Sequence, residues 1–88
     1  MFTLEVSLRY SPFPLSIQKK DHDDVLRVFE QIKNAMRDNA DTIIIDLTCD
    51  KMSNKSIAVL SKEIIAVQIY EKSAIAGGSK RPGFSLEN

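Results

Sequence analysis

The sequence predicts an α+β fold of two layers, in which one helix packs on one face of a mainly antiparallel sheet. Two patterns lead to this prediction. Apolar and polar residues alternate over residues 2–18 and over much of residues 42–70, which is typical of strands with one buried face. Between these segments, apolar side chains recur at intervals of three and four in residues 25–36, which is typical of an amphipathic helix. The predicted order is β-β-α-β-β-β, which permits a β-grasp-like topology and leaves the strand order open.

The first two strands form a predicted β-hairpin. In Phe2–Tyr10, the apolar residues at even positions face one side, and the polar residues at odd positions, beginning with Thr3, face the other. This strand ends at Ser11-Pro12-Phe13-Pro14, because proline has no N–H to donate to a strand ladder. The alternation resumes in residues 15–18, so we expect a hairpin with a proline-containing turn.

The predicted helix begins after Asp21, whose side chain suits an N-cap. Asp23 and Asp24 then place negative charge at the positive end of the helix dipole. We expect the helix to end near Asn39. Three further strands are predicted in residues 42–49, 57–60 and 64–70, with a tight connection, such as one 3₁₀ turn, in residues 61–63.

The predicted core combines the inward-facing apolar side chains of the helix and the strands. Its members are Leu4, Val6, Leu8, Leu15, Ile17, Val25, Val28, Phe29, Ile32, Met36, Ile43, Ile45, Leu47, Val59, Val67 and Ile69. After residue 72 the composition changes, because all three glycines of the chain, Gly77, Gly78 and Gly83, lie there. We therefore expect one domain in residues 1–72 and a flexible tail in residues 73–88.

The composition disfavours several classes of protein. Twelve Lys plus Arg residues balance twelve Asp plus Glu residues, whereas a dedicated nucleic-acid-binding protein usually carries a basic excess. A single cysteine excludes an internal disulfide and a CxxC zinc pair. No apolar run approaches the ~20 residues that span a bilayer, and the N-terminal residues lack the pattern of a signal peptide. We expect a cytoplasmic protein without membrane insertion.

Three side chains are candidates for chemistry, and each has a simpler structural interpretation. His22 is the only histidine, but it lies at a helix start with no second His or Cys nearby to complete a metal site. Cys49 lies close to Lys51, which would favour a thiolate, but the strand alternation places Cys49 in the core. Asp46 faces the open side of its strand without a catalytic companion. We therefore expect neither an enzyme nor a metal or cofactor site.

The sheet face away from the helix is the main candidate for interaction. Ile44, Leu60 and Tyr70 would form an apolar patch there if the last three strands are neighbours. Such a patch can mark a homodimer or a partner surface. The alternatives are a patch that the C-terminal tail covers, and scattered exposed residues without a role.

Two sets of charged residues offer further candidates. Lys80, Arg81 and Phe84 make the tail a candidate docking peptide that becomes ordered on binding; the alternative is a tail that is simply disordered. We expect Arg9 to lie near the basic pair Lys19-Lys20. Together with the basic pair of the tail, these residues would contact RNA or an acidic partner. The alternative for these residues is solvated surface charge.

Several segments, in order along the chain, resemble one family of proteins. They are Phe2-Thr3-Leu4-Glu5, Ser11-Pro12-Phe13-Pro14 with Ser16-Ile17-Gln18, Leu47-Thr48-Cys49-Asp50-Lys51, Ile57-Ala58-Val59-Leu60-Ser61, residues 64–73 and Arg81-Pro82-Gly83-Phe84. Together they are similar to a small uncharacterised family of cyanobacterial proteins, uncharacterised protein family 0367. The resemblance implies a cytosolic protein of an oxygenic phototroph and assigns no catalytic residue.

The function that these observations favour is a non-enzymatic protein-interaction or regulatory module, which binds a protein partner or a second copy of itself. Two alternatives stay open. One is a small RNA-binding regulator, and the other is a subunit whose site is completed by another chain.

Overall fold

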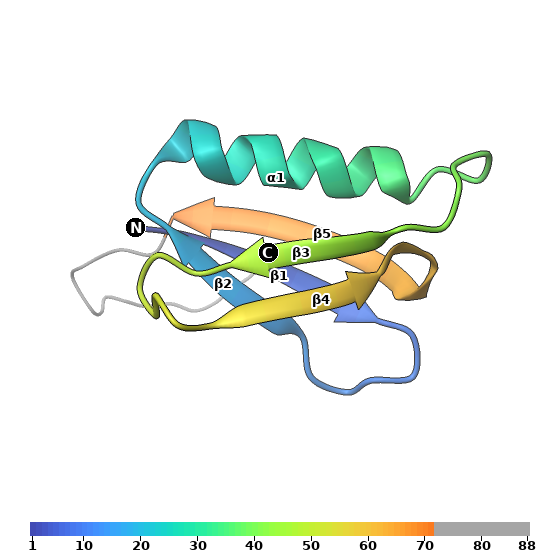
Figure 1. The fold of residues 1–88 in the computed structure, drawn as a ribbon, viewed down its shortest axis with the longest axis horizontal. Coiled ribbons are helices and arrows are strands. Elements are labelled where there is room, and N and C mark those ends of the chain that lie inside the picture. Colours follow the sequence, from blue (N-terminus) through green and yellow to red (C-terminus); the bar gives the residue numbers. More distant parts are fainter. Residues whose placement is uncertain (72–88) are drawn as a thin grey trace, which may run out of the picture.

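A computed structural model describes residues 1–71 of the 88-residue chain. The elements within these residues are β1 (Phe2–Leu8), β2 (Leu15–Lys19), α1 (His22–Ala35), β3 (Ile44–Thr48), β4 (Ser56–Leu60), the 3₁₀ turn η1 (Ser61–Glu63) and β5 (Ile64–Glu71). Figure 1 shows α1 lying along one side of the strands. The predicted α+β class and the β-β-α-β-β-β order are therefore confirmed, including the turn in residues 61–63. The expected flexible tail, residues 73–88, lies outside the described residues.

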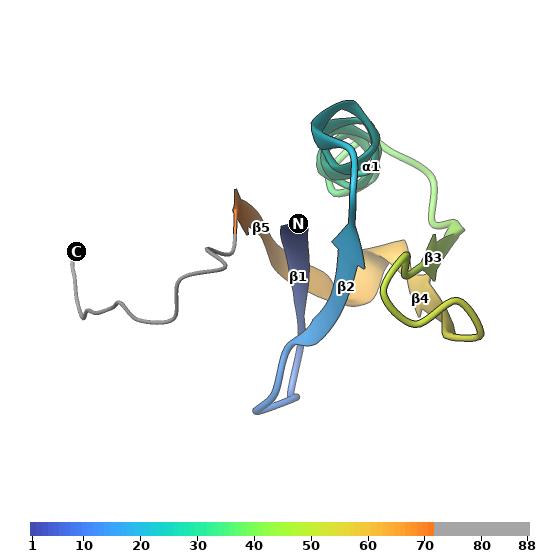
Figure 2. The ribbon, with the colours of Figure 1, turned by 90° about the vertical axis from the view of Figure 1, so that its left-hand side faces the viewer.

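The central strand is β1, which the sequence alone did not identify. It pairs antiparallel with β2 on one side and with β5 on the other. Leu4 lies opposite both Ile17 and Ile69, so the inward side chains of all three strands share one face. Figure 2 shows α1 above this three-stranded sheet and the β3–β4 pair at its side.

The last three strands do not all join one sheet, because the chain turns sharply between β4 and β5. β3 pairs antiparallel with β4. Ser61 fixes the corner that follows: its N–H donates to the carbonyl oxygen of Ile43 (2.8 Å), and its hydroxyl oxygen accepts from the Ile43 N–H (2.9 Å). η1 then directs β5 to β1. The β3–β4 pair meets β2 through separate contacts, such as the hydrogen bond from Asp50 N–H to the carbonyl oxygen of Gln18 (2.7 Å).

The core lies between α1 and the inward faces of the strands. Its buried apolar members are Leu4, Val6, Ile17, Val25, Ile32, Ala35, Ile45, Leu47, Cys49, Val59 and Ile64. The other predicted members, except one, are partly buried against this cluster. The exception is Ile43, whose predicted place in the core is wrong: it is 44% exposed, because it precedes β3 and its backbone is bound to Ser61 at the corner.

The helix begins as predicted and ends earlier than predicted. Asp21 is the N-cap, and its carboxylate accepts a hydrogen bond from the Asp23 N–H (3.3 Å). The helix ends at Ala35 rather than near Asn39. After Met36 the sequence offers no apolar side chain for the core until residue 40, so further helical turns would bury nothing.

Candidate interaction surfaces

The loop between β1 and β2 carries the two most exposed aromatic side chains of the described residues. Tyr10 is 95% exposed and Phe13 is 77% exposed. Figures 1 and 2 show this loop extending away from the rest of the fold. The alternation placed Tyr10 on the same side as Leu4, but β1 ends at Leu8 and Tyr10 has left the strand, with a φ of 65°. A positive φ is sterically unfavourable for a residue with a Cβ atom.

The base of this loop is held in place by contacts with η1. The Arg9 N–H donates to the carbonyl oxygen of Glu63 (2.8 Å), and the Arg9 guanidinium donates to the carbonyl oxygen of Lys62 (3.1 Å). Within the loop, the Ser11 N–H donates to Leu8 O (3.2 Å), and the Ser11 hydroxyl donates to Phe13 O (3.1 Å). Two prolines, at positions 12 and 14, restrict the backbone further. The two aromatic rings are therefore presented by a restrained loop.

A second surface lies beside β5, which is an edge strand of the three-stranded sheet. An open groove of about 530 Å³ runs between α1 and this strand, and its lining is mostly apolar. The residues that line it are Phe29, Lys33, Met36, Arg37, Ala66 and Val67. The Lys33 ammonium lies 5.3 Å from the centre of the Phe29 ring and 3.5 Å from a carboxylate oxygen of Glu30. The groove is therefore apolar at its base and basic at part of its rim.

The predicted patch of Ile44, Leu60 and Tyr70 is assembled only in part. Ile44 and Leu60 lie directly opposite one another in the β3–β4 register and are 66% and 45% exposed. Tyr70 lies on β5, opposite Thr3 of β1, because β5 does not pair with β4. The outer face of β3–β4 thus carries a two-residue apolar pair, and Tyr70 belongs to a different surface.

Tyr70 is part of a polar cluster centred on Glu5. The Tyr70 hydroxyl and the Gln68 side-chain amide both donate to the Glu5 carboxylate, at 3.1 Å and 2.6 Å. Burial raises the pKa of the Tyr70 phenol above its usual 10.0, and the negative charge of Glu5 adds to this effect. Thr3, which was predicted on the exposed face, is instead buried. Its hydroxyl lies beside the Tyr70 phenol and partly offsets the rise in the pKa of that group, but it makes no well-formed hydrogen bond with the described residues. The open face of β1 is therefore closely covered near Tyr70.

Cys49 lies in the core, as the alternation predicted, where its sulfur accepts a hydrogen bond from the Gln18 N–H (3.3 Å). Burial raises the pKa of this thiol, but backbone hydrogen bonds, first from Gln18, and the charge of Lys55 together outweigh burial, so that the pKa lies below 9.0. A cavity of about 200 Å³ adjoins the thiol and also contacts Lys51. Its described lining includes no histidine or carboxylate that would act as a general base.

The other predicted candidates for chemistry do not gather. His22 packs edge-on against the Phe2 ring (5.1 Å between centroids), and its Nδ1 lies 3.9 Å from Asp23. Asp46 is exposed on β3, opposite Ala58. Within residues 1–71, no group of three His, Cys, Asp or Glu side chains is placed to hold a metal ion.

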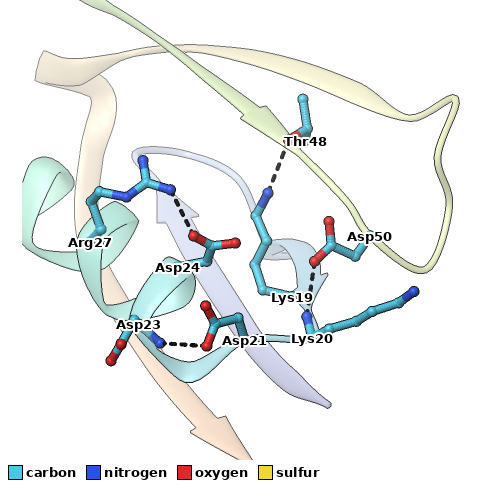
Figure 3. Close-up of polar contacts among 8 residues, drawn as sticks. All are labelled: Lys19, Lys20, Asp21, Asp23, Asp24, Arg27, Thr48 and Asp50. Atoms are coloured by element: carbon cyan, nitrogen blue, oxygen red, sulfur yellow. Dashed lines mark hydrogen bonds and ion pairs between the residues drawn. The ribbon is translucent and has the colours of Figure 1, made fainter.

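The basic side chains of the described residues are dispersed, and several of them make local contacts. Lys19 pairs with Phe2 in the hairpin register, so Lys19-Lys20 lies at the end of the hairpin opposite Arg9, and the expectation that they lie close together is wrong. Figure 3 shows Lys19 Nζ donating to the Thr48 hydroxyl (3.0 Å) and the Lys20 N–H donating to Asp50 (2.9 Å). The predicted tail residues Lys80, Arg81 and Phe84 lie outside the described residues.

The model of the UPF0367 protein family matches residues 3–72. The chain belongs to this family. It is 61% identical over 88 residues to a UPF0367 protein of Prochlorococcus marinus subsp. pastoris, with 99% of each chain covered. It is 47% identical over 88 residues to a UPF0367 protein of Synechococcus sp. (strain CC9902), with 100% of each chain covered. A UPF0367 protein of Synechococcus sp. (strain CC9605) is 44% identical over 88 residues, which are 100% of this chain and 79% of that relative.

The comparisons confirm the family resemblance and its cyanobacterial hosts, and the family is uncharacterised, so the function is unknown. No solved structure matches the chain. Among the described residues, no helix has the length and apolar character to cross a membrane.

The sequence identified neither the groove beside β5 nor the surface of the β1–β2 loop. The segment Ser11–Pro14 reads as an ordinary turn, and the period-two pattern assigns Tyr10 to the strand. The available signal was the presence of two aromatic residues within a turn that contains two prolines, because turn tips are usually small or polar.

Proposed function

We propose that this UPF0367 protein is a non-enzymatic protein-interaction module of the cyanobacterial cytoplasm. The observation that carries the proposal is the restrained β1–β2 loop with the exposed rings of Tyr10 and Phe13. Aromatic side chains dominate the energetic centres of protein interfaces, because they bury a large area with few rotatable bonds. A loop that is ordered before binding loses little conformational entropy when the partner docks.

Backbone strain at Tyr10 supports the same function. A left-handed φ at a non-glycine residue costs about 1–2 kcal/mol, and it persists where surrounding contacts impose it. Here the contacts of Arg9 with η1 and the hydrogen bond from Ser11 to Leu8 O impose the conformation. The Tyr10 ring is almost fully exposed, so its burial within the chain does not offset the cost of the backbone strain. In our proposal, a partner that covers the ring offsets this cost.

An apolar pocket on another protein fits this loop better than RNA does. The nearest basic side chain, Arg9, is held by the Lys62 carbonyl oxygen and lies 3.9 Å from a carboxylate oxygen of Glu63, so its charge is partly compensated. Contacts with phosphate groups supply most of the affinity of a protein for RNA. The basic pair Lys19-Lys20 lies at the far end of the hairpin from this loop. The alternative of an RNA-binding regulator therefore has the less favourable charge distribution.

A quantitative pull-down from nuclease-treated cyanobacterial lysate tests the proposal. The baits are the full chain, the Tyr10→Ala/Phe13→Ala variant and a control variant, Ile44→Ala/Leu60→Ala, which removes an exposed apolar pair elsewhere. We expect one protein whose recovery falls at least about tenfold with the loop variant and is retained with the control, because burial of each Phe-sized ring contributes roughly 1.5–3 kcal/mol.

The control variant also tests the β3–β4 face as an interface. If only the Ile44→Ala/Leu60→Ala bait fails to recover the partner, the partner binds the β3–β4 face, and the loop proposal is contradicted. Equal recovery of every protein by all three baits would contradict a role for either surface. Circular dichroism of the three baits confirms that each is folded.

A further inference from the structure

Within residues 1–71, no strand pairs with the outer edge of β5, and this edge has an unusual composition. β5 spans eight residues and pairs with β1 along one edge. Alternate N–H and C=O groups of the other edge point away from the sheet. Soluble proteins usually protect such edges with charged side chains, prolines or bulges, because an unprotected edge pairs with other strands. The protein therefore needs either a protective device or a partner at β5.

The protective devices of β5 are confined to its two ends. The register with β1 shifts between Ser7 and Leu8, at the start of β5, and the strand ends on the charged Glu71. Between these points, residues 66–70 read Ala-Val-Gln-Ile-Tyr and contain neither charge nor proline. This central segment can pair with another strand without burying a charge.

The central segment is complementary to itself when two copies run antiparallel. With Gln68 on the two-fold axis, Val67 of each copy lies opposite Ile69 of the other, on the face that carries the groove. On the opposite face, the small Ala66 lies opposite the large Tyr70. Directly opposite β-branched side chains stabilise strand pairs, and large–small pairs pack without crowding. A two-fold axis satisfies both edges with the same pattern of hydrogen bonds.

The groove beside β5 provides room for the side chains that such a pair brings. Its apolar base is formed by Phe29, Met36 and Val67, on the helix side of the strand. Val67 and Ile69 of the second copy are partly buried against that copy's own core, and their exposed parts lie on this side in the Gln68-centred register. Ile65, which is 57% exposed, lies opposite Glu71 of the second copy in this register, at the end of the paired segment. The basic side chains of Lys33 and Arg37 remain at the rim, where interface charges stay solvated.

A second copy fits this edge better than the chain's own C-terminal residues. Those residues carry Lys80, Arg81 and Pro82. Pairing them with β5 would bring two cations toward a rim that already carries Lys33 and Arg37, and proline would remove one ladder hydrogen bond. The sequence of β5 carries neither disadvantage.

We propose that two copies of this chain associate through antiparallel pairing of β5 with β5, centred on Gln68, to form a continuous six-stranded sheet. This inference goes beyond the function proposed for the β1–β2 loop and uses a separate surface. The dimer presents two loops, so that a partner with two binding sites would bind with higher avidity.

Sedimentation equilibrium of the full chain over about a hundredfold range of concentration tests the dimer. Ile65→Glu is expected to raise the dimer dissociation constant at least about 100-fold, because it places a second carboxylate opposite Glu71 at both ends of the paired segment. The matched control, Ile44→Glu, changes an isoleucine of similar exposure on β3 and leaves the dimer unchanged. A monomeric wild-type chain, or equal weakening by both variants, would overturn the inference.

Disulfide trapping tests the register in a Cys49→Ser background. Residues directly opposite in an antiparallel pair have Cβ atoms about 4.5–5.5 Å apart, which is close to disulfide geometry. Gln68→Cys is therefore expected to form a covalent dimer under mild oxidation, while Ala66→Cys, which lies opposite Tyr70, forms much less. Trapping by Ala66→Cys alone, or by neither variant, would contradict the Gln68-centred pairing. The loop variant Tyr10→Ala/Phe13→Ala stays dimeric, so failure of one proposal leaves the other testable.

Discussion

Replacing Tyr10 with glycine is expected to stabilise the fold, although it removes a side chain that the proposed interaction needs. The φ of 65° costs a residue with a Cβ atom about 1–2 kcal/mol, and glycine avoids this cost. Glycine in turn adds about 0.5–1 kcal/mol of chain entropy to the unfolded state. The net expected gain is about 0.5–1 kcal/mol in the free energy of unfolding.

Tyr10→Ala is the matched control, because alanine keeps the Cβ atom and removes only the ring. Since the ring is 95% exposed, the free energy of unfolding is expected to change by less than about 0.5 kcal/mol. Urea unfolding measures both variants at one protein concentration. With a slope of about 1 kcal/mol per molar urea, the glycine variant should shift the midpoint upward by about 0.5–1 M.

Two results would refute this reasoning. A glycine variant that is less stable than the alanine variant would mean that the backbone at Tyr10 is not strained. An alanine variant that loses more than about 1 kcal/mol would mean that the ring packs on its own domain. In that case the exposed ring would have a structural role, and the argument from strain to function would fail.

Three further predictions concern the core and the polar cluster. Ile32→Ala, at a fully buried position, should lower the free energy of unfolding by about 3 kcal/mol. Leu26→Ala, at a helix position that is 37% exposed, should lower it by less than about 1 kcal/mol. Equal losses in urea unfolding would contradict the assigned helix face. In a variant whose only tyrosine is Tyr70, ultraviolet absorbance should show a phenol pKa above 10.0, and Glu5→Gln should lower this pKa. Because the pKa is raised in the folded state, the contribution of Tyr70 to stability is fully present below pH 10.0 and is lost as the pH rises through the folded pKa. Thr3→Val should raise the midpoint of urea unfolding by an amount equivalent to about 1 kcal/mol, because the buried Thr3 hydroxyl lies beside the Tyr70 phenol without a well-formed hydrogen bond; a lower midpoint would indicate that the two groups are bonded.

Local patterns in the sequence were sufficient for the helix and the strands. Asp21 and the apolar repeat that includes Val25 and Ile32 place α1, because capping and amphipathic burial depend on residues within a few positions of one another. The alternation around Leu4 places β1 for the same reason.

Strand order and the assembly of surfaces depend on contacts that no local pattern encodes. Tyr70 fits a patch with Ile44 in sequence, but the Ser61 corner sends β5 to the far side of β1. The exposure of Tyr10 was equally hidden, since alternation continues through it while the backbone turns to a positive φ. These features depend on tertiary hydrogen bonds, which act over long sequence separations.

Photo-crosslinking from the β1–β2 loop in living cells tests the interaction proposal most directly. Benzoylphenylalanine is introduced at Phe13, where it keeps an aromatic ring, and separately at Leu26 on α1 as a control. The account predicts a crosslink to one defined protein from position 13 that is absent from position 26. Identical products from both positions, or adducts with only RNA or lipid from position 13, would contradict it.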